Sequence, residues 1–266
     1  MNVMNKPIVC IDLDGTLVNH RGSIHPKDIE ILNSTTEVTF VIATGRSLEG
    51  VRRTFKHYRI VLHPPIPFPM VLLNGTLVFG PNEHFILYHP FKNSIQEIIL
   101  KIVCQFPQVT SLFMDARGIY QLNLTPFGQR SIMLFDFETK PFIKKSDEYS
   151  FGKVMCISES HDLLMNIHQL LENLDVELAF SMDSALEITS MGINKGSGLL
   201  TLVESQGWDP TTIIAVGDGE NDFPLFEKAR MSFSPSSSPA NVQLRANYII
   251  NPTHNGILFP VMSMIL

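Results

Sequence analysis

The stretch IVCIDLDGTL, from Ile8 to Leu17, is the strongest indication of the fold in this chain. Its apolar run Ile8–Ile11 shows no polar alternation, which is typical of a strand buried on both faces of a parallel sheet. Asp12 and Asp14 follow at once, and Gly15 allows a tight turn after them. Because side chains at i and i+2 of an extended segment lie on the same side, both carboxylates are expected to face one cleft.

A second acidic motif occurs two hundred residues later, in TIIAVGDGENDFPLF from Thr212 to Phe226. Here too an apolar run ends in a glycine turn with carboxylates, Asp218 and Asp222. Clefts form at the carboxyl ends of parallel strands, so both motifs are expected to meet at one edge of the sheet. A divalent cation could hold these negative charges together.

Two shorter signals accompany the acidic motifs. The apolar run Val38–Ala43 ends in Thr44-Gly45-Arg46, and Lys195 stands at the start of a helical pattern. Taken singly, each signal has an ordinary explanation: an aspartate that caps a turn, a hydroxyl at a strand end, or an exposed helix lysine. Unrelated motifs rarely occur together by chance, so the ordered set favours a functional site over a series of turns.

The outer parts of the chain alternate strand and helix, which predicts a doubly wound α/β fold with five or six parallel strands and crossover helices. The expected strands are 8–11, 38–43, 70–73, 212–216, 231–233 and 247–250, and the expected helices are 47–58, 194–205 and 222–229. The C-terminal segment GILFPVMSMIL is too short to span a bilayer and is predicted to be a buried terminal helix.

The middle of the chain has a different pattern. Residues 81–186 mix strand-like stretches, 84–88, 111–114, 119–124, 153–157 and 177–181, with helical patterns at 94–105 and 161–174. We therefore expect a core built from 1–80 and 187–266, interrupted by an inserted α+β cap domain, 81–186. The cap is expected to act as a lid over the carboxyl ends of the core strands.

Composition excludes several classes of function. The chain has 266 residues, a net charge of −6 and a pI near 5.8, which argues against a nucleic-acid-binding surface. Its three cysteines do not suggest a disulfide framework or a metal-binding spacing, which fits a reducing cytoplasm. No signal peptide is expected, because the first apolar run meets Asp12 at once. Cys10, two residues earlier on the buried strand, is predicted to be a core residue and not a nucleophile.

Four motifs in order, DLDGTL, ATGR, NKGSGL and GDGEND, closely resemble those of the haloacid dehalogenase-type (HAD) phosphohydrolases. The likeness is to the Cof-type branch with a large α/β cap, and it covers most of the chain outside 81–186. This resemblance implies a Rossmann-like core and an enzyme that hydrolyses phosphoric monoesters. It also implies that Asp12 is the nucleophile that forms an aspartyl-phosphate and that Asp14 is the general acid and base.

The resemblance further implies an Mg²⁺ cofactor. Its ligands would be the Asp12 carboxylate, the Asp14 backbone carbonyl and the Asp218 carboxylate, with Asp222 as an outer partner. Lys195 would act in catalysis and hold the phosphate. The other implied phosphate- or substrate-binding residues are Leu13, Thr44, Gly45, Arg46, Asn74 and Asn221. For Arg46 the sequence leaves a second role open, that of pairing with a neighbouring carboxylate.

The leading interpretation is a cytoplasmic, Mg²⁺-dependent phosphatase that acts on a small phosphorylated metabolite, with sugar phosphates among the candidates. We expect no nucleic-acid or membrane partner, and a monomer or weak homodimer. One alternative is a phosphomutase of the same superfamily, which returns the phosphoryl group to a sugar. Another is a non-catalytic module that binds sugar phosphates, although such a module would normally have lost Asp12 or Asp14.

Overall fold

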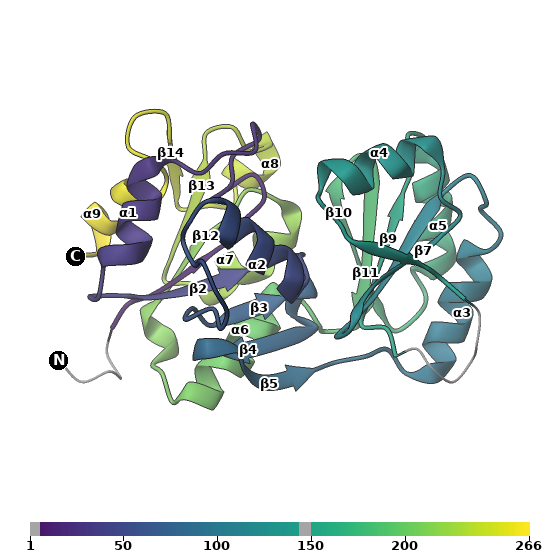
Figure 1. Cartoon of the computed structure of the whole chain (residues 1–266), viewed down its shortest axis with the longest axis horizontal. Coiled ribbons are helices and arrows are strands. Elements are labelled where there is room, and N and C mark those ends of the chain that lie inside the picture. Colours follow the sequence, from purple (N-terminus) through teal and green to yellow (C-terminus); the bar gives the residue numbers. More distant parts are fainter. Residues whose placement is uncertain (1–5, 144–149) are drawn as a thin grey trace. The chain divides into compact units, whose positions relative to one another are not determined.

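A computed structural model describes residues 6–143 and 150–266. The chain divides into two compact units (Figure 1). The core unit consists of the residues up to Leu87 together with Lys195–Leu266, and the second unit runs from Tyr88 to Asn194.

Within the described residues, the core unit is built on an eight-stranded sheet. In spatial order its strands are β14 (Tyr248–Ile250), β13 (Met231–Pro235), β12 (Ile213–Val216), β1 (Ile8–Ile11), β2 (Thr39–Ala43), β3 (Met70–Leu72), β4 (Leu77–Gly80) and β5 (His84–Tyr88). The first six run parallel, and β4 pairs antiparallel with β3. The predicted doubly wound α/β class is confirmed.

The core helices are α1 (Pro26–Ser34), α2 (Leu48–His57), α6 (Lys195–Gln206), α7 (Phe223–Lys228), α8 (Ala240–Gln243) and α9 (Leu258–Ile265). Apolar side chains of β1 and β2 pack against α6 and α7 in one buried cluster that includes Cys10, Leu202 and Leu225. Burial raises the pKa of the Cys10 thiol, which supports its interpretation as a core residue. The terminal helix was predicted correctly, and it packs against α1.

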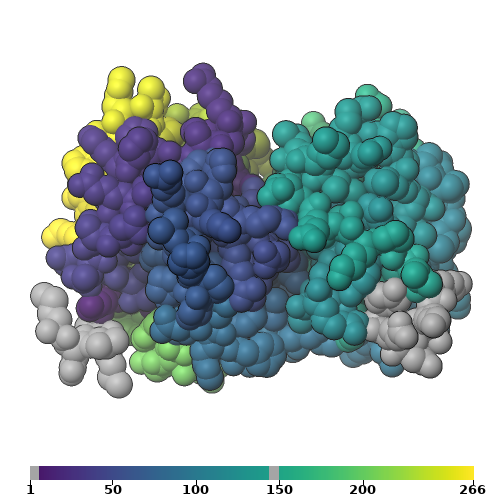
Figure 2. Space-filling view, viewed as in Figure 1, coloured from purple at the N-terminus to yellow at the C-terminus, as the bar shows by residue number. Residues whose placement is uncertain are grey.

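The two ends of the core unit are joined by Asp28 of α1, which is buried. Its carboxylate accepts hydrogen bonds from the backbone N–H groups of Ile257, at 3.0 Å, and Leu258, at 2.8 Å. These bonds satisfy donors that the start of α9 would otherwise leave without partners. The purple N-terminal and yellow C-terminal residues accordingly adjoin on the surface of this unit (Figure 2).

The second unit contains a six-stranded, mainly antiparallel sheet within the described residues. In spatial order its strands are β10 (Val176–Met182), β11 (Ala185–Ser190), β9 (Lys153–Ile157), β6 (Thr110–Asp115), β7 (Gly118–Leu122) and β8 (Thr139–Pro141). Its helices are α3 (Asn93–Val103), α4 (Pro126–Leu134) and α5 (His161–Leu171). Helices α3 and α5 cover one face of the sheet, where Phe113, Val154 and Leu186 share a buried cluster with Leu164.

The edges of this unit differ from the predicted boundaries at 80/81 and 186/187. The strand at 84–88, expected in the cap, is β5 and belongs to the core sheet beside β4. The boundary at 186/187 falls inside β11, which pairs with β9 and β10. Strand-like composition cannot say which sheet a strand joins, because hydrogen bonds to distant neighbours decide that.

Across residues 6–143 and 150–266, every helix is too short or too polar to cross a bilayer.

Candidate active site

The carboxyl ends of β1, β2 and β12 bring the sequence motifs together. Strand β1 lies between the other two, with Ile11 opposite Val216 of β12 and Ile42 of β2. The backbone N–H of Asp12 continues the ladder by donating to the Val216 carbonyl at 2.9 Å. Residues from the two ends of the chain therefore reach the same edge of the sheet, as the apolar runs predict.

Lys195 joins two carboxylates inside this edge. Its ammonium Nζ lies 2.7 Å from Asp12 Oδ1 and 2.6 Å from Asp222 Oδ1, and all three side chains are buried. Burial by itself would lower the pKa of the Lys195 ammonium, but the charges of Asp12 and Asp222 outweigh burial and raise it. Lys195 thus remains a cation beside the predicted nucleophile.

The loop after β12 is shaped by Asp222. Its Oδ2 accepts the backbone N–H groups of Asp218, at 3.0 Å, and Gly219, at 3.1 Å. Since Oδ1 is held by Lys195, both oxygens of Asp222 already have protein donors. This arrangement fits an outer partner of a cation site, the role implied for Asp222, better than a ligand.

Asp218 is oriented by the first motif. The Thr16 hydroxyl donates to Asp218 Oδ1 at 3.0 Å. Gly15, at φ +87°, lies directly under the same carboxylate, and a Cβ atom there would come within 1.9 Å of Asp218 Oδ2. A side chain at position 15 would therefore displace Asp218, so glycine is required for close approach as well as for the turn.

Three carboxylates lie close together at this edge of the sheet. Asp12, Asp218 and Asp222 each offer one oxygen, and these oxygens lie within 4.8 Å of one another. Burial raises the pKa of Asp12, opposed by Lys195 and reinforced by Asp222 and Asp218. Burial and the charge of Asp222 likewise raise the pKa of Asp218 to about 6. One ammonium leaves this negative charge incompletely balanced, so a hard divalent cation with oxygen ligands fits the site.

The side chain of Asp14 pairs with Arg46 and not with Lys195. Arg46 binds it with both arms of the guanidinium, Nε to Oδ2 at 2.8 Å and Nη2 to Oδ1 at 2.5 Å. Arg46 is itself held by Thr54, whose Oγ1 accepts from Nη1 at 2.6 Å. Of the two roles that the sequence left open for Arg46, these contacts show the pairing with a carboxylate. The Asp14 carboxylate remains 46% exposed, so a substrate can reach it.

The loops after β2 and β3 lie side by side. The N–H of Leu73 donates to the Arg46 carbonyl at 3.1 Å, and the N–H of Asn74 donates to the Thr44 carbonyl at 3.2 Å. Leu73 and Asn74 both have left-handed backbone conformations, with φ of 50° and 57°. Such strain is uncommon outside glycine and clusters at functional sites. Thr44, Gly45 and Asn74 thus lie next to one another, and their contact with a phosphate stays a prediction.

Two other predicted residues are less directly placed. Leu13 has a fully buried side chain, so only its backbone can face a phosphate. Asn221 is half-buried in the loop between Asp218 and Asp222. A Cβ atom on Gly219 would lie 2.7 Å from Asn221 Oδ1, so the glycine leaves room for this amide.

Sequence reasoning missed two residues that approach Asp218. Thr16 lies in the DLDGTL motif and was not singled out, although a hydroxyl two residues after an aspartate was a usable signal. His20 places Nε2 4.0 Å from Asp218 Oδ2. The position of His20 depends on the conformation of the loop after β1, which no local sequence pattern predicts.

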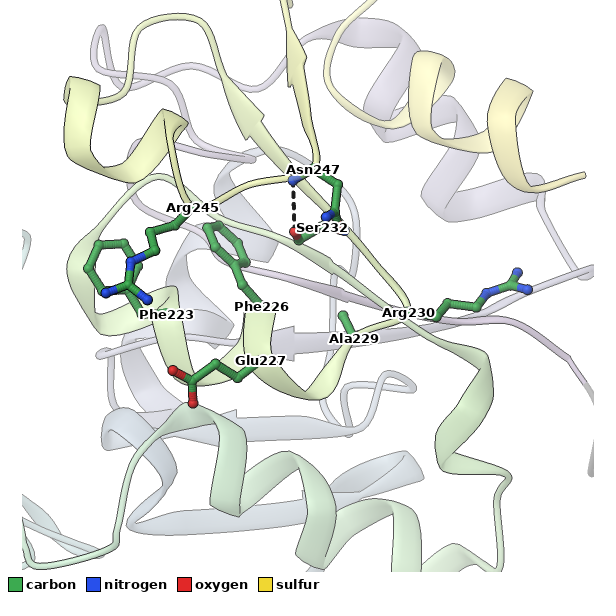
Figure 3. A pocket seen from close by; sticks show the side chains of 8 residues that line it. All are labelled: Phe223, Phe226, Glu227, Ala229, Arg230, Ser232, Arg245 and Asn247. Carbon is green, nitrogen blue, oxygen red and sulfur yellow. Dashed lines mark hydrogen bonds between the residues drawn. The ribbon is translucent and has the colours of Figure 1, made fainter.

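A separate pocket of about 240 Å³ lies on the core unit and contains none of the predicted site residues. Its lining residues are Phe223, Phe226, Glu227, Ala229, Arg230, Ser232, Arg245 and Asn247. Asn247 Oδ1 is occupied by the Ser232 N–H and hydroxyl, and the Arg245 guanidinium lies over the Phe223 ring at 5.3 Å. Arg230 points away from the pocket (Figure 3). Ser232, Asn247 and Arg245 are thus engaged with other residues of the lining.

Comparison with known proteins identifies the family. The sequence pattern of the haloacid dehalogenase-like hydrolases matches residues 9–259. The chain belongs to this family. It is 23% identical over 272 residues to the pyridoxal phosphate phosphatase YbhA of Escherichia coli strain K12, covering 93% of this chain and 94% of YbhA. It is 22% identical over 245 residues to the 5-amino-6-(5-phospho-D-ribitylamino)uracil phosphatase YcsE of Bacillus subtilis strain 168, covering 91% and 88%.

Solved structures share the fold of this HAD-like hydrolase. A haloacid dehalogenase-like hydrolase from Bacteroides thetaiotaomicron superposes with a TM-score of 0.81 at 20% identity, covering 98% of this chain and all of that one. BT4131, described as a HAD subclass IIB sugar phosphatase, gives 0.83 at 16% identity, again with 98% and 100% coverage. The predicted family, with its Cof-type branch, and the prediction of a HAD-type phosphatase are confirmed.

Proposed function

We propose that this HAD-like hydrolase is an Mg²⁺-dependent phosphatase that hydrolyses a small phosphorylated metabolite through an aspartyl-phosphate. The observation that supports it most is the cluster of Asp12, Asp218 and Asp222 at the carboxyl edge of the sheet, in which Lys195 pairs with Asp12 and Asp222. The named relatives act on pyridoxal phosphate and on a ribitylaminouracil phosphate. A sugar phosphate or a similarly small phosphomonoester is the corresponding substrate class here.

In the first half-reaction, an Asp12 carboxylate oxygen attacks phosphorus, and the bond from phosphorus to the leaving oxygen breaks. Asp14 gives its proton to that oxygen, so the product leaves as a neutral alcohol. The second half-reaction hydrolyses the aspartyl-phosphate. Asp14 takes a proton from water, the water oxygen attacks phosphorus, and Asp12 is released as a carboxylate.

The remaining residues orient the phosphate. Lys195 supplies a fixed cation beside Asp12, and the Thr44 hydroxyl, the Gly45 amide and the Asn221 amide supply donors for the phosphoryl oxygens. Arg46 holds Asp14 in a defined position through two hydrogen bonds. Because Asp14 must exchange a proton with the leaving oxygen, this pairing has to loosen when the substrate binds.

Bound Mg²⁺ would reduce the repulsion between the carboxylates and the phosphate and polarise a phosphoryl oxygen. The Asp12 and Asp218 carboxylates and the Asp14 carbonyl would hold it. Asp222, whose oxygens accept from Lys195 and two backbone amides, would keep the loop that carries Asp218 in place.

A direct test compares wild type with Asp12→Asn on an aryl phosphate, with Mg²⁺ and with excess chelator. We expect wild-type turnover only with Mg²⁺, and a loss of roughly a hundredfold or more in the variant, because a neutral amide is a poor nucleophile toward phosphorus. Turnover by Asp12→Asn within about tenfold of wild type would refute the nucleophile assignment. Full activity in chelator would refute the metal assignment.

The role of 81–186 as a cap that selects the leaving group is part of the same proposal. With the boundaries of the second unit, the corresponding test replaces residues 88–194 by a short flexible linker and requires a cooperative melt of the remaining core. We expect residual Mg²⁺-dependent activity on aryl phosphates and no selectivity among metabolites. A core that still discriminates like the whole chain would show that specificity lies elsewhere. Cytoplasmic localisation and a monomeric or weakly dimeric state remain predictions.

A further inference from the structure

The loop after β1 brings three residues to the carboxylate of Asp218. Thr16 donates to its Oδ1 at 3.0 Å, Gly15 lies directly below it, and His20 places Nε2 4.0 Å from its Oδ2. Thr16 holds Oδ1, whereas Gly15 and His20 both lie beside Oδ2, and Gly15 has no side chain that could donate to it. His20 is therefore the residue of this loop that can act on the second oxygen.

The loop holds His20 near this position through its own hydrogen bonds. Asn19 Oδ1 accepts the N–H groups of Arg21, at 2.9 Å, and Ser23, at 3.2 Å, and the Asn19 N–H donates to the Ser23 carbonyl. The Tyr58 hydroxyl donates to the Gly22 carbonyl and ties the tip of the loop to the end of α2. His20 is thus presented by a braced turn, although its side chain is 57% exposed.

We propose that His20 is a positioning residue for the cation site, on the basis of the function proposed above. Its Nε2–H donates to the Asp218 carboxylate and keeps a ligand oxygen turned toward Asp12. The 4.0 Å distance exceeds a hydrogen bond, so the proposed contact requires a rotation of the exposed imidazole toward Oδ2. A neutral imidazole has one N–H donor, so the contact does not depend on a charged histidine.

The expected change in Mg²⁺ affinity can be taken from other metal sites in which a residue orients a ligand without binding the metal. Groups that orient a ligating carboxylate typically change metal affinity by about 10- to 100-fold when they are removed. His20 is exposed, and Thr16 already holds the other oxygen, so we expect the lower end, about tenfold. The metal-free fold should be little affected, because His20 is exposed and its Nε2 lies 4.0 Å from Asp218, beyond hydrogen-bond distance.

The experiment measures the affinity for Mg²⁺ alone, without substrate, from the rise of the melting temperature during a titration with MgCl₂. The variants are His20→Ala, His20→Gln and His20→Asn. The glutamine amide nitrogen reaches about as far as Nε2, whereas the asparagine nitrogen reaches only about as far as Nδ1. His254→Ala is the matched control, because His254 is another exposed core histidine in a different loop.

We expect the Mg²⁺ dissociation constant to rise about tenfold in His20→Ala and His20→Asn, to recover in His20→Gln, and to stay unchanged in His254→Ala. Metal-free melting temperatures should match wild type. Unchanged affinity in His20→Ala, or recovery by asparagine as good as by glutamine, would overturn the role of His20. If wild type itself fails to bind Mg²⁺, the proposed metal dependence is refuted, and this result differs from failure of the His20 variants alone.

Discussion

Replacing Asp218 with asparagine is expected to stabilise the metal-free protein at neutral pH while it removes a ligand from the proposed cation site. Asp218 has a side chain only 13% exposed and lies close to two other carboxylates. Burial, followed by the charge of Asp222, raises its pKa from 3.8 to about 6. Its ionised form is therefore disfavoured in the folded chain, and an uncharged amide of the same shape avoids that cost.

The magnitude follows from the two pKa values. A rise from 3.8 to about 6 is equivalent to about 3 kcal/mol, at about 1.36 kcal/mol for each pH unit. Asparagine keeps an oxygen for the Thr16 hydroxyl, and new contacts of its NH₂ group offset part of the gain. We therefore expect Asp218→Asn to raise the free energy of unfolding by about 1–3 kcal/mol at pH 8 without metal.

The sign of the pH dependence is fixed by proton binding. Between pH 3.8 and about 6 the folded chain keeps a proton on Asp218 that the unfolded chain has lost. The stability of wild type relative to Asp218→Asn therefore falls as pH rises through this window and levels off above it. Below about pH 4 both wild type and Asp218→Asn carry an uncharged group at position 218, so the difference in their free energies of unfolding should nearly vanish.

The assay is denaturant unfolding of metal-free wild type and Asp218→Asn at a series of pH values between about 4 and 8, followed by the same series with Mg²⁺. Mg²⁺ should stabilise wild type and leave the variant nearly unchanged, because binding to the folded state adds stability only where the site is intact. A variant that is less stable than wild type at pH 8, or a difference that does not change with pH, would refute the electrostatic argument.

Three further predictions concern other carboxylates and their partners. Asp14→Asn should slow hydrolysis of alkyl phosphates more than that of aryl phosphates, because poor leaving groups need a proton; equal losses in steady-state assays would contradict the acid role. Lys195→Met should abolish turnover and cost about 3–5 kcal/mol in denaturant unfolding, since Asp12 and Asp222 lose their buried counter-charge; a fully stable variant would contradict this. Asp28→Ala should lower stability by about 1–3 kcal/mol by leaving two N–H groups at the start of α9 without partners, with Mg²⁺ affinity as the control.

The core was predictable because its signals are local. Buried parallel strands require continuous apolar runs, and these runs end where the chain turns at the carboxyl edge, so Asp12, Thr44 and Asp218 could be assigned to one place from sequence. The Ser47 N-cap of α2 and the terminal helix α9 were also predictable from residue type. The edges of the second unit were not, since β5 joins the core sheet and β11 the sheet of the second unit, and local composition does not distinguish the two sheets.

The sequence by itself determined which chemical groups the site contains and the order in which strands deliver them. The tertiary structure alone decided how those groups pair: Arg46 with Asp14, Lys195 between Asp12 and Asp222, and His20 beside Asp218. The physical reason is the difference in sequence separation between local patterns and these pairs. Apolar periodicity and turn chemistry act over a few residues, whereas these pairs join groups up to about two hundred positions apart, and their distances depend on the packing of the whole sheet.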